Sequence, residues 1–392
     1  MTTGAASLGI LPSLFAHGNH TEVGMAIGTT FDEQIRARLK ELSSFHQLRL
    51  FAATSEGARI VDEFLQTHKT AYPQYIEEIR ATAEGARVAF MDLFILNLRN
   101  ELSVLMAASG NHDAHGIQPP AVIEDCSDYL LKEQGKHAWV AHNEDGDLAA
   151  RNRAFLLTAS MYGDGVTRAS RFSAFVYPGE LPTVGFGWND HGVGFTLNGL
   201  YPDYTQTGAI GRNFISRELL EAGSLDEAMA IISGRRMATG HGYNVFSIGQ
   251  DRPTIISVEV APSLDGKGPN LFHSHHVVDG AFFRANKYDY LVDVPQIPSA
   301  IRSSKARERR AHELPSPTSA GDLLDVLGDT EGSYPIYRTA KGPDSGYTLC
   351  TALFDLLGHV VRVFVENPRT ARRVHVKMSL VFDRDELAVT GL

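Results

Sequence analysis

The sequence predicts a mixed α+β fold in which antiparallel sheets are covered by helices. Apolar residues recur three and four positions apart over most of the first hundred residues, as in helices that bury one face. From Cys126 onward the pattern changes to short segments rich in β-branched and aromatic residues, which are typical of strands. Strands and helices that occupy separate blocks of a chain indicate α+β layering.

The N-terminal part is predicted to form helices separated by short breaks. Pro73 falls at the start of one of them, where its missing backbone N–H is tolerated. The predicted helices span residues 35–50, 58–68, 72–86 and 90–105. A loop is then expected over 110–120, because glycine, paired prolines and short polar residues follow one another there without an apolar period.

Strands are predicted for most of the remaining chain, and two helical blocks interrupt them. The expected strands are 126–132, 137–143, 153–160, 172–177, 183–188, 192–198, 243–249, 254–260, 280–285, 347–355, 359–365 and 374–381. The helical blocks are 211–222 with 225–233, and 305–314 with 319–328. A second loop-rich stretch is expected from Gly332 to Gly346, and no internal repeat divides the chain.

Composition and charge limit the class of protein. The 392 residues are 43% hydrophobic, which is enough for one large domain or two ordinary ones. The formal charge of −10 and the lack of a basic stripe argue against nucleic acid and anionic membrane surfaces as partners. No apolar run approaches the roughly 18 residues of a membrane span, and the first residues lack the basic stretch of a signal peptide. A cytoplasmic location is therefore expected.

The candidate chemistry centres on Cys126, one of two cysteines in the chain, which stands where the predicted loop meets a predicted strand. Phosphate-loop, dinucleotide-binding, Gly-x-Ser-x-Gly and His-Glu-x-x-His signatures are absent from the sequence. If strands 126–132 and 137–143 form a hairpin through Gln134 and Gly135, the polar residues 142–147 return beside the sulfur. These residues alone leave two interpretations of Cys126 open. It is either a cysteine that packs in the core beside a polar turn, or a nucleophile in a polar site.

Five motifs in order along the chain carry a resemblance to a known family. They are Gly18-Asn-His-Thr-Glu-Val-Gly24-Met-Ala-Ile-Gly28, Asp125-Cys126-Ser127, His142-Asn143-Glu144-Asp145, Asn189-Asp-His-Gly192-Val-Gly194-Phe-Thr-Leu-Asn198-Gly199-Leu200 and, more weakly, Arg284-Ala285-Asn286-Lys287-Tyr288-Asp289. With these motifs the chain resembles the acyl-coenzyme A:6-aminopenicillanic acid acyltransferase family, whose members are cysteine N-terminal nucleophile hydrolases. It is most similar to the N-β-alanyl-dopamine hydrolase branch of that family.

The resemblance implies a four-layer αββα sandwich formed by a single domain, residues 1–392. It also implies a precursor that cuts its own backbone between Asp125 and Cys126, which leaves an associated α chain, 1–125, and β chain, 126–392. A thiol with a free pKa of ~8.5 is a weak nucleophile, whereas a freed α-amine, with a pKa of ~7.7–8.0, can accept the thiol proton near neutral pH. The cut would therefore supply both nucleophile and base from one residue.

By the same resemblance, the protein hydrolyses a small-molecule amide whose acyl group is short and bears an amine. Cys126 then carries an acyl thioester, Asp145 orients the freed amine, and Asn286 donates a hydrogen bond to the oxyanion. Carboxylates near the nucleophile fit an ammonium on the acyl group. These carboxylates belong to Asp128, Glu144 and Asp147, and the residues expected to bind substrate are Asn143, Glu144 and Asn198.

Two positions depart from the family pattern. Asp125 stands where many relatives have glycine or histidine, and its carboxylate can assist or slow the cut. Asn286 lies in Arg-Ala-Asn where the family has His-x-Asn, and the nearby His273-Ser-His275-His276 segment competes for the same place in the alignment.

Three other functions stay open. An acyl-coenzyme A-dependent N-acyltransferase differs from the hydrolase in that an amine, and not water, resolves the thioester. An uncleaved member that binds a small amide without turnover is the second. A metal-dependent hydrolase is the third, because paired histidines can ligate zinc. Its candidate ligands are His17, His20, His112, His115, His273, His275 and His276.

The favoured hydrolase is expected to need no cofactor and no metal. Its expected partners are the amide substrate and the two chains of one precursor, and assembly into a homo-oligomer stays open.

Overall fold

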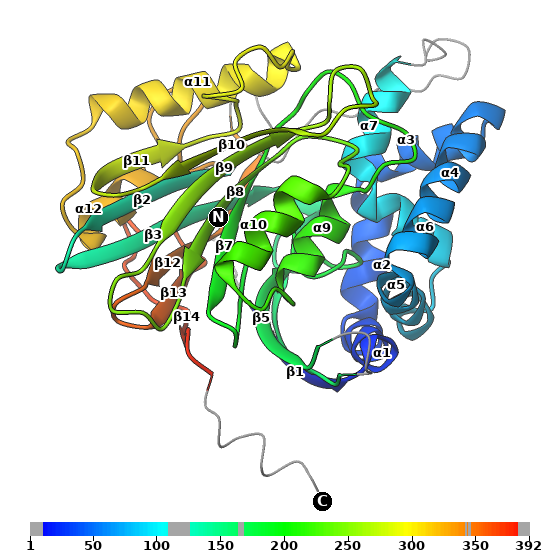
Figure 1. The fold of residues 1–392 in the computed structure, drawn as a ribbon, viewed down its shortest axis with the longest axis horizontal. Coiled ribbons are helices and arrows are strands. Elements are labelled where there is room, and N and C mark those ends of the chain that lie inside the picture. Colours follow the sequence, from blue (N-terminus) through cyan, green and yellow to red (C-terminus); the bar gives the residue numbers. More distant parts are fainter. Residues whose placement is uncertain (1–10, 109–125, 164–167, 342, 344–345, 383–392) are drawn as a thin grey trace, which may run out of the picture.

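The computed structural model describes residues 11–108, 126–163, 168–341, 343 and 346–382. Its fold is mixed α+β, with two sheets flanked by helices (Figure 1). This agrees with the fold class predicted from the sequence. The predicted loop 110–120 and Asp125 lie outside the described residues.

The first sheet has eight strands in the order β1-β4-β5-β6-β7-β8-β9-β10. Neighbouring strands are antiparallel except β1 and β4, which run parallel. The strands are β1 (Ser13–Gly18), β4 (Phe155–Met161), β5 (Ser170–Val176), β6 (Phe186–Asn189), β7 (Val193–Gly199), β8 (His241–Ser247), β9 (Ile255–Ala261) and β10 (Leu271–His276). Strands β1 and β10 were not predicted.

The second sheet has six antiparallel strands in the order β11-β2-β3-β12-β13-β14. They are β11 (Gly280–Arg284), β2 (Ser127–Glu133), β3 (His137–Gly146), β12 (Tyr347–Asp355), β13 (Val360–Phe364) and β14 (Val376–Ser379). Strands β2 and β3 form the predicted hairpin, and Gly135 in the turn has a φ of 76°, which favours glycine. The hairpin prediction is confirmed.

Residues 11–108 form seven helices, which pack with two later helices against strands of the first sheet. The seven are α1 (His20–Thr30), α2 (Asp32–Glu41), α3 (Ser43–Ala52), α4 (Ser55–Ala71), α5 (Pro73–Ala86), α6 (Phe90–Asn97) and α7 (Arg99–Ala108), and the later two are α9 (Arg212–Leu219) and α10 (Leu225–Gly234). The predicted single helices 35–50 and 90–105 were wrong, because each is interrupted. Leu42 adopts an extended conformation between α2 and α3, and Leu98 leaves helical geometry between α6 and α7.

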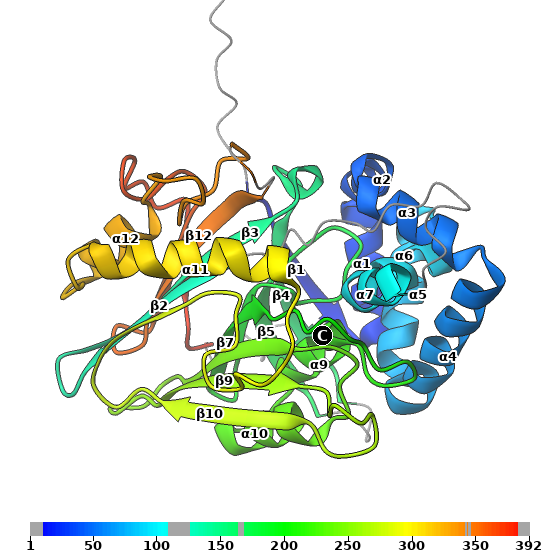
Figure 2. The same cartoon turned by 90° about the horizontal axis from the view of Figure 1, so that it is seen from above.

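A buried apolar cluster joins the two sheets. It contains Val140 of β3 and Phe354 of β12 together with Phe175 of β5 and Phe186 of β6. Another cluster joins the second sheet to α11 (Pro298–Glu313) and α12 (Ala320–Leu327). In Figure 2, α11 and α12 lie beside β2, β3 and β12, while the N-terminal helices gather at the opposite end of the molecule. Each sheet is thus packed on both faces.

Within the described part of the chain, no helix is both long enough and apolar enough to cross a membrane.

Candidate active site

Cys126 directly precedes β2 and lies at one end of the β2–β3 hairpin. Ser127 pairs with Asn143, so Cys126 is level with Glu144 on the neighbouring strand. The Cys126 side chain is buried and forms no disulfide. On the other side of β3, Glu144 is level with Cys350 of β12, a second free thiol that packs in the apolar cluster between the sheets. The predicted core position of Cys350 is confirmed.

Strand β3 divides the predicted site residues between two environments, because successive side chains of a strand point to opposite faces. Val140 belongs to the cluster between the sheets, whereas Ala141 belongs to the cluster under the C-terminal helices. The alternation puts His142 and Glu144 on the face between the sheets. Asn143, one step along the strand, bonds on the opposite face to the carbonyl of Leu327 at the end of α12.

His142 lies between two buried carboxylates. Its Nδ1 is 3.0 Å from both carboxylate oxygens of Asp128, and its Nε2 is 2.9 Å from Oε2 of Glu144. Ionised carboxylates accept hydrogen bonds, so both ring nitrogens donate and the ring is an imidazolium. Burial opposes this charge, but the charge and hydrogen bonds of Asp128, together with the hydrogen bonds to Cys126 and Glu144, hold the pKa of His142 well above its usual range.

Asp128 is held in place from the first sheet. The Thr196 hydroxyl and the Asn198 side-chain amide each donate to it at 2.6 Å. The amide of Asn244 in turn donates to Oδ1 of Asn198 at 3.1 Å. Asn198 was expected to bind substrate, and in the structure its amide supports the Asp128–His142 pair.

Glu144 is fixed on its second oxygen by Tyr177, whose hydroxyl donates to Oε1 at 2.6 Å. A side chain at Gly185 would collide with the Glu144 carboxylate, so the absence of a side chain there lets the two segments approach. The guanidinium of Arg38 lies 4.9 Å from the centre of the Tyr177 ring. Glu144 therefore has a single defined orientation beside the cysteine.

The Cys126 thiol lies against this carboxylate and imidazolium. Its sulfur, one His142 ring nitrogen and one Glu144 carboxylate oxygen all lie within 4.8 Å of one another. Burial and the charge of Glu144 raise the pKa of the Cys126 thiol to about 12, against the opposing effect of His142. In the intact chain the sulfur is therefore a protonated, weak nucleophile near neutral pH.

Asp145 occupies the other face of β3. Thr348 donates to its Oδ1 at 2.5 Å, and its buried Oδ2 has no hydrogen-bond partner among the described residues. Burial raises the pKa of Asp145 to about 7, although the nearby cations Arg338 and Arg307 favour its charged form. The charge of Asp145 in turn acts on the Cys126 thiol. A buried acceptor without a partner is thus available near the nucleophile.

Arg307 of α11 joins the nucleophile to Asn286 and was missed by the sequence analysis. Its Nη1 donates at 2.7 Å to both the Cys126 carbonyl and the Ser127 hydroxyl. Its Nη2 donates at 2.9 Å to Oδ1 of Asn286. Small residues one helical turn away, Ser303 and Ala311, lie on the same buried face of α11. That pattern of small residues around one arginine was the available signal.

Asn286 is fully buried just after β11, and its side-chain amide donates to the Gly199 carbonyl at 2.9 Å. One further N–H of this amide is left for another acceptor. In Asn143, by contrast, every hydrogen-bonding group of the side chain has a partner within the protein. Its amide donates to the carbonyls of Leu327 and Ile336, and its oxygen accepts from Thr351. The predicted substrate contact of Asn143 is thus a structural anchor in this conformation.

Three of the histidines considered as metal ligands contact other side chains in the structure. His20 is 2.7 Å from Glu78 in a buried pair, and the rings of His273 and His275 stack on Tyr290. His112 and His115 lie outside the described residues.

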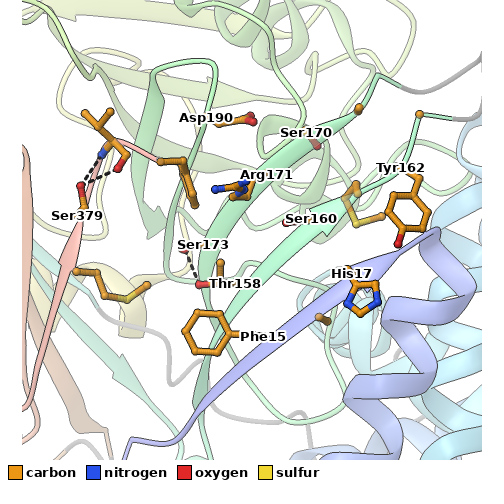
Figure 3. Close-up of a pocket in the computed structure, with 17 residues that line it drawn as sticks. Phe15, His17, Thr158, Ser160, Tyr162, Ser170, Arg171, Ser173, Asp190 and Ser379 are labelled. Atoms are coloured by element: carbon orange, nitrogen blue, oxygen red, sulfur yellow. Dashed lines mark hydrogen bonds between the residues drawn. The ribbon is translucent and has the colours of Figure 1, made fainter. Parts of the chain in front are cut away.

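A large cavity lies away from the cysteine. It has a volume of about 1300 Å³ and is bounded by β1, β4, β5 and the end of β14. Figure 3 shows Phe15, His17 and Arg171 around it, with Thr158 and Ser173 joined by a hydrogen bond of 2.8 Å. Cys126 does not line this cavity.

Comparison with known proteins identifies the family of the chain. The chain belongs to the acyl-coenzyme A:6-aminopenicillanic acid acyl-transferase family, to which residues 131–370 match. The matched region begins just after Cys126 and includes β3, Asn286 and Arg307. Among individual proteins, the chain is similar to a β-alanyl-dopamine/carcinine hydrolase of Drosophila melanogaster. The two are 26% identical over 383 residues, which cover 95% of this chain and 97% of the relative.

Proposed function

We propose that the protein is an N-terminal cysteine amidohydrolase, which hydrolyses a small-molecule amide through a thioester on Cys126. The observation that carries this proposal is the buried cysteine beside the His142–Glu144 pair, at the start of a strand in a sheet that is packed on both faces. Two facing sheets between helical layers fit the four-layer αββα sandwich of N-terminal nucleophile hydrolases. Family membership supports the same reaction class.

A cut before Cys126 would supply the base that the buried, protonated thiol needs. In the intact chain burial and the charge of Glu144 raise the thiol pKa to about 12, and both ring nitrogens of His142 already donate to carboxylates, so this imidazole cannot take the thiol proton. A freed α-amine on Cys126 has a reference pKa of ~7.7–8.0 and can take the thiol proton. The partnerless Oδ2 of Asp145 is suited to accept a hydrogen bond from that amine and so to orient it.

The reaction then proceeds in two steps. The thiolate attacks the amide carbonyl, the second N–H of Asn286 donates to the oxyanion, and the α-ammonium returns its proton to the leaving amine. Water then attacks the thioester and releases the acid and the free thiol. Arg307 positions both partners, because it binds the Cys126 carbonyl and the Asn286 side chain at once.

An amino-bearing acyl group, such as β-alanyl, is the substrate we favour. The name of the similar hydrolase supports this choice. Of the carboxylates considered for the ammonium, Asp128 accepts from His142, Thr196 and Asn198, and Asp147 pairs with Arg38 at 3.1 Å through one oxygen. We favour Glu144 because its carboxylate adjoins the sulfur. A cytoplasmic location remains a prediction, and assembly into a homo-oligomer stays open.

An acyltransferase is the second candidate, because the matched family is described by an acyl transfer reaction. The two candidates share the thioester and differ in the acceptor that resolves it. Supplying acyl-coenzyme A together with an acceptor amine distinguishes them. With a transferase, the amount of new amide rises with the concentration of the acceptor amine. With a hydrolase, free acid is released at a rate that the acceptor amine does not change.

Release of free amine from an N-β-alanyl amide tests the proposed function. We expect turnover by the parent protein, none by Cys126→Ala, and nearly unchanged turnover by Cys350→Ala, because Cys350 packs among apolar side chains. Turnover that survives in Cys126→Ala would reject the nucleophile. Equal loss in both folded variants would also contradict the assignment.

A further inference from the structure

We propose that Cys126, His142 and Glu144 form a Zn²⁺-binding site whose occupation blocks the nucleophile. The ligands would be the Cys126 sulfur, Nε2 of His142 and a carboxylate oxygen of Glu144. One ligand atom from each of the three residues lies within 4.8 Å of the other two, and the trio is the one group with suitable geometry in the part of the chain that the structure describes. All three side chains are buried.

The donor set fits zinc. Sulfur, imidazole nitrogen and carboxylate oxygen are the three ligand types of protein zinc sites, and three protein ligands leave a fourth position open. Tetrahedral coordination at ordinary zinc bond lengths separates ligand atoms by roughly 3.4–3.6 Å. The imidazole nitrogen and Oε2 are 2.9 Å apart, so small side-chain movements would bring all three atoms to zinc distances.

The surrounding residues supply the outer contacts that zinc ligands usually have. Asp128 accepts from Nδ1 of His142 with both oxygens, which fixes the ring and leaves Nε2 facing Glu144. Tyr177 donates to the other oxygen of Glu144 at 2.6 Å. Two of the three ligands are therefore already oriented before any metal arrives.

The charges also balance. The Asp128 and Glu144 carboxylates around one imidazolium carry a net charge of about −1 when the thiol is neutral. Zinc binding would remove the thiol proton and the Nε2 proton, so that one Zn²⁺ replaces two protons and the buried charge is unchanged. In the intact chain, Zn²⁺ reacts with the thiol and the imidazolium. The products are the zinc complex of the thiolate and the neutral imidazole, and two protons.

Occupation by zinc would stop the chemistry of Cys126, because the sulfur lone pair that attacks a carbonyl is bound to the metal. Zinc here is an inhibitor, which distinguishes this site from the metal-dependent hydrolase considered above. The inhibition rests on the proposed function, whereas the metal binding rests on the trio of ligands alone.

The binding test uses the full chain titrated with Co²⁺, which gives a near-ultraviolet thiolate-to-cobalt absorption band when sulfur is a ligand. We expect a saturable band at one equivalent that Zn²⁺ abolishes, loss of the band in Cys126→Ser, and an intact band in Cys350→Ser. A His273→Ala/His275→Ala variant controls for the surface histidines and should also keep it. Tyr177→Phe should weaken zinc binding by about 10–100-fold, the usual effect of removing an outer contact.

Calorimetry of the parent protein with Zn²⁺ needs no variant, and we expect saturable binding of one zinc per copy of the protein. No cobalt band, a band that depends on Cys350 or on the surface histidines, or no saturable zinc binding would overturn the site. Zinc that binds as expected but leaves amide turnover unchanged or faster would overturn the inhibition. Zinc binding without any amide turnover would reject the proposed function and leave the metal site standing.

Discussion

Replacing Arg307 with lysine is expected to lower both the stability of the fold and the rate of turnover. The guanidinium is fully buried and donates to the Cys126 carbonyl, the Ser127 hydroxyl and the Asn286 side chain. A lysine ammonium is a single point charge, so it cannot reproduce the two-nitrogen geometry that reaches both the hairpin and Asn286.

The magnitude follows from the hydrogen bonds that lysine leaves unmade. At least two charge-assisted bonds to buried acceptors are lost, each worth about 1.5 kcal/mol at the low end. The free energy of unfolding should therefore fall by about 3 kcal/mol, a large share of the ~5–15 kcal/mol typical of a domain. Turnover should fall by roughly 10–100-fold, because Asn286 loses the contact that aims its amide.

Urea unfolding on the Cys126→Ala background, where the chain is expected to stay intact, measures the stability change. Turnover is measured with the native cysteine. Arg309→Lys is the matched control, since Arg309 is exposed on the same helix, and its effect should stay within about 0.5 kcal/mol. A stability loss for Arg307→Lys no larger than that of the control would refute the reasoning.

Three further predictions concern the groups around the sulfur. Asn286→Ala should lower turnover roughly a hundredfold. It should also lower the free energy of unfolding by about 1–3 kcal/mol, because Arg307 and the Gly199 carbonyl lose a buried partner. A variant as fast as the parent would show that Asn286 does not donate to the oxyanion. Burial raises the pKa of Asp145 from 3.8 to about 7, so its neutral form contributes stability that is complete below pH 3.8 and lost as the pH rises through about 7. Asp145→Asn on the Cys126→Ala background should therefore gain stability relative to its parent between about pH 4 and pH 8 in urea titrations, and a constant difference would contradict the assigned pKa. With the native cysteine, Asp145→Asn should slow both the cut and turnover. A chelator should not lower turnover of the parent, and chelator-sensitive activity would favour a metal-dependent hydrolase.

The β2–β3 hairpin was predictable because its determinants are local. Alternating apolar residues flank a turn with a glycine at positive φ, and the hairpin then fixes Cys126 level with Glu144. Strand β1 and helix α1 were missed, although Asn19 and Glu22 form a capping box at the start of that helix. The signal was present in the sequence and was used only as a family motif.

The partners of the site residues were not predictable, because they come from distant parts of the chain. Arg307 reaches Cys126 across 181 positions, and Thr196 reaches Asp128 across 68. Strand periodicity separates Asn143 from Glu144 onto opposite faces, but it does not say which face holds the chemistry. His142 was quoted as part of a motif, and its position between two carboxylates depends on the pairing of the two strands and on the facing sheet.

Denaturing mass spectrometry of the purified protein tests the central claim most directly, namely that Cys126 becomes an N-terminal nucleophile. The account predicts two fragments in the active parent, residues 1–125 and 126–392, and a single chain of 392 residues in Cys126→Ala. A fully active parent that remains one uncut chain would contradict the maturation and the role of the freed amine.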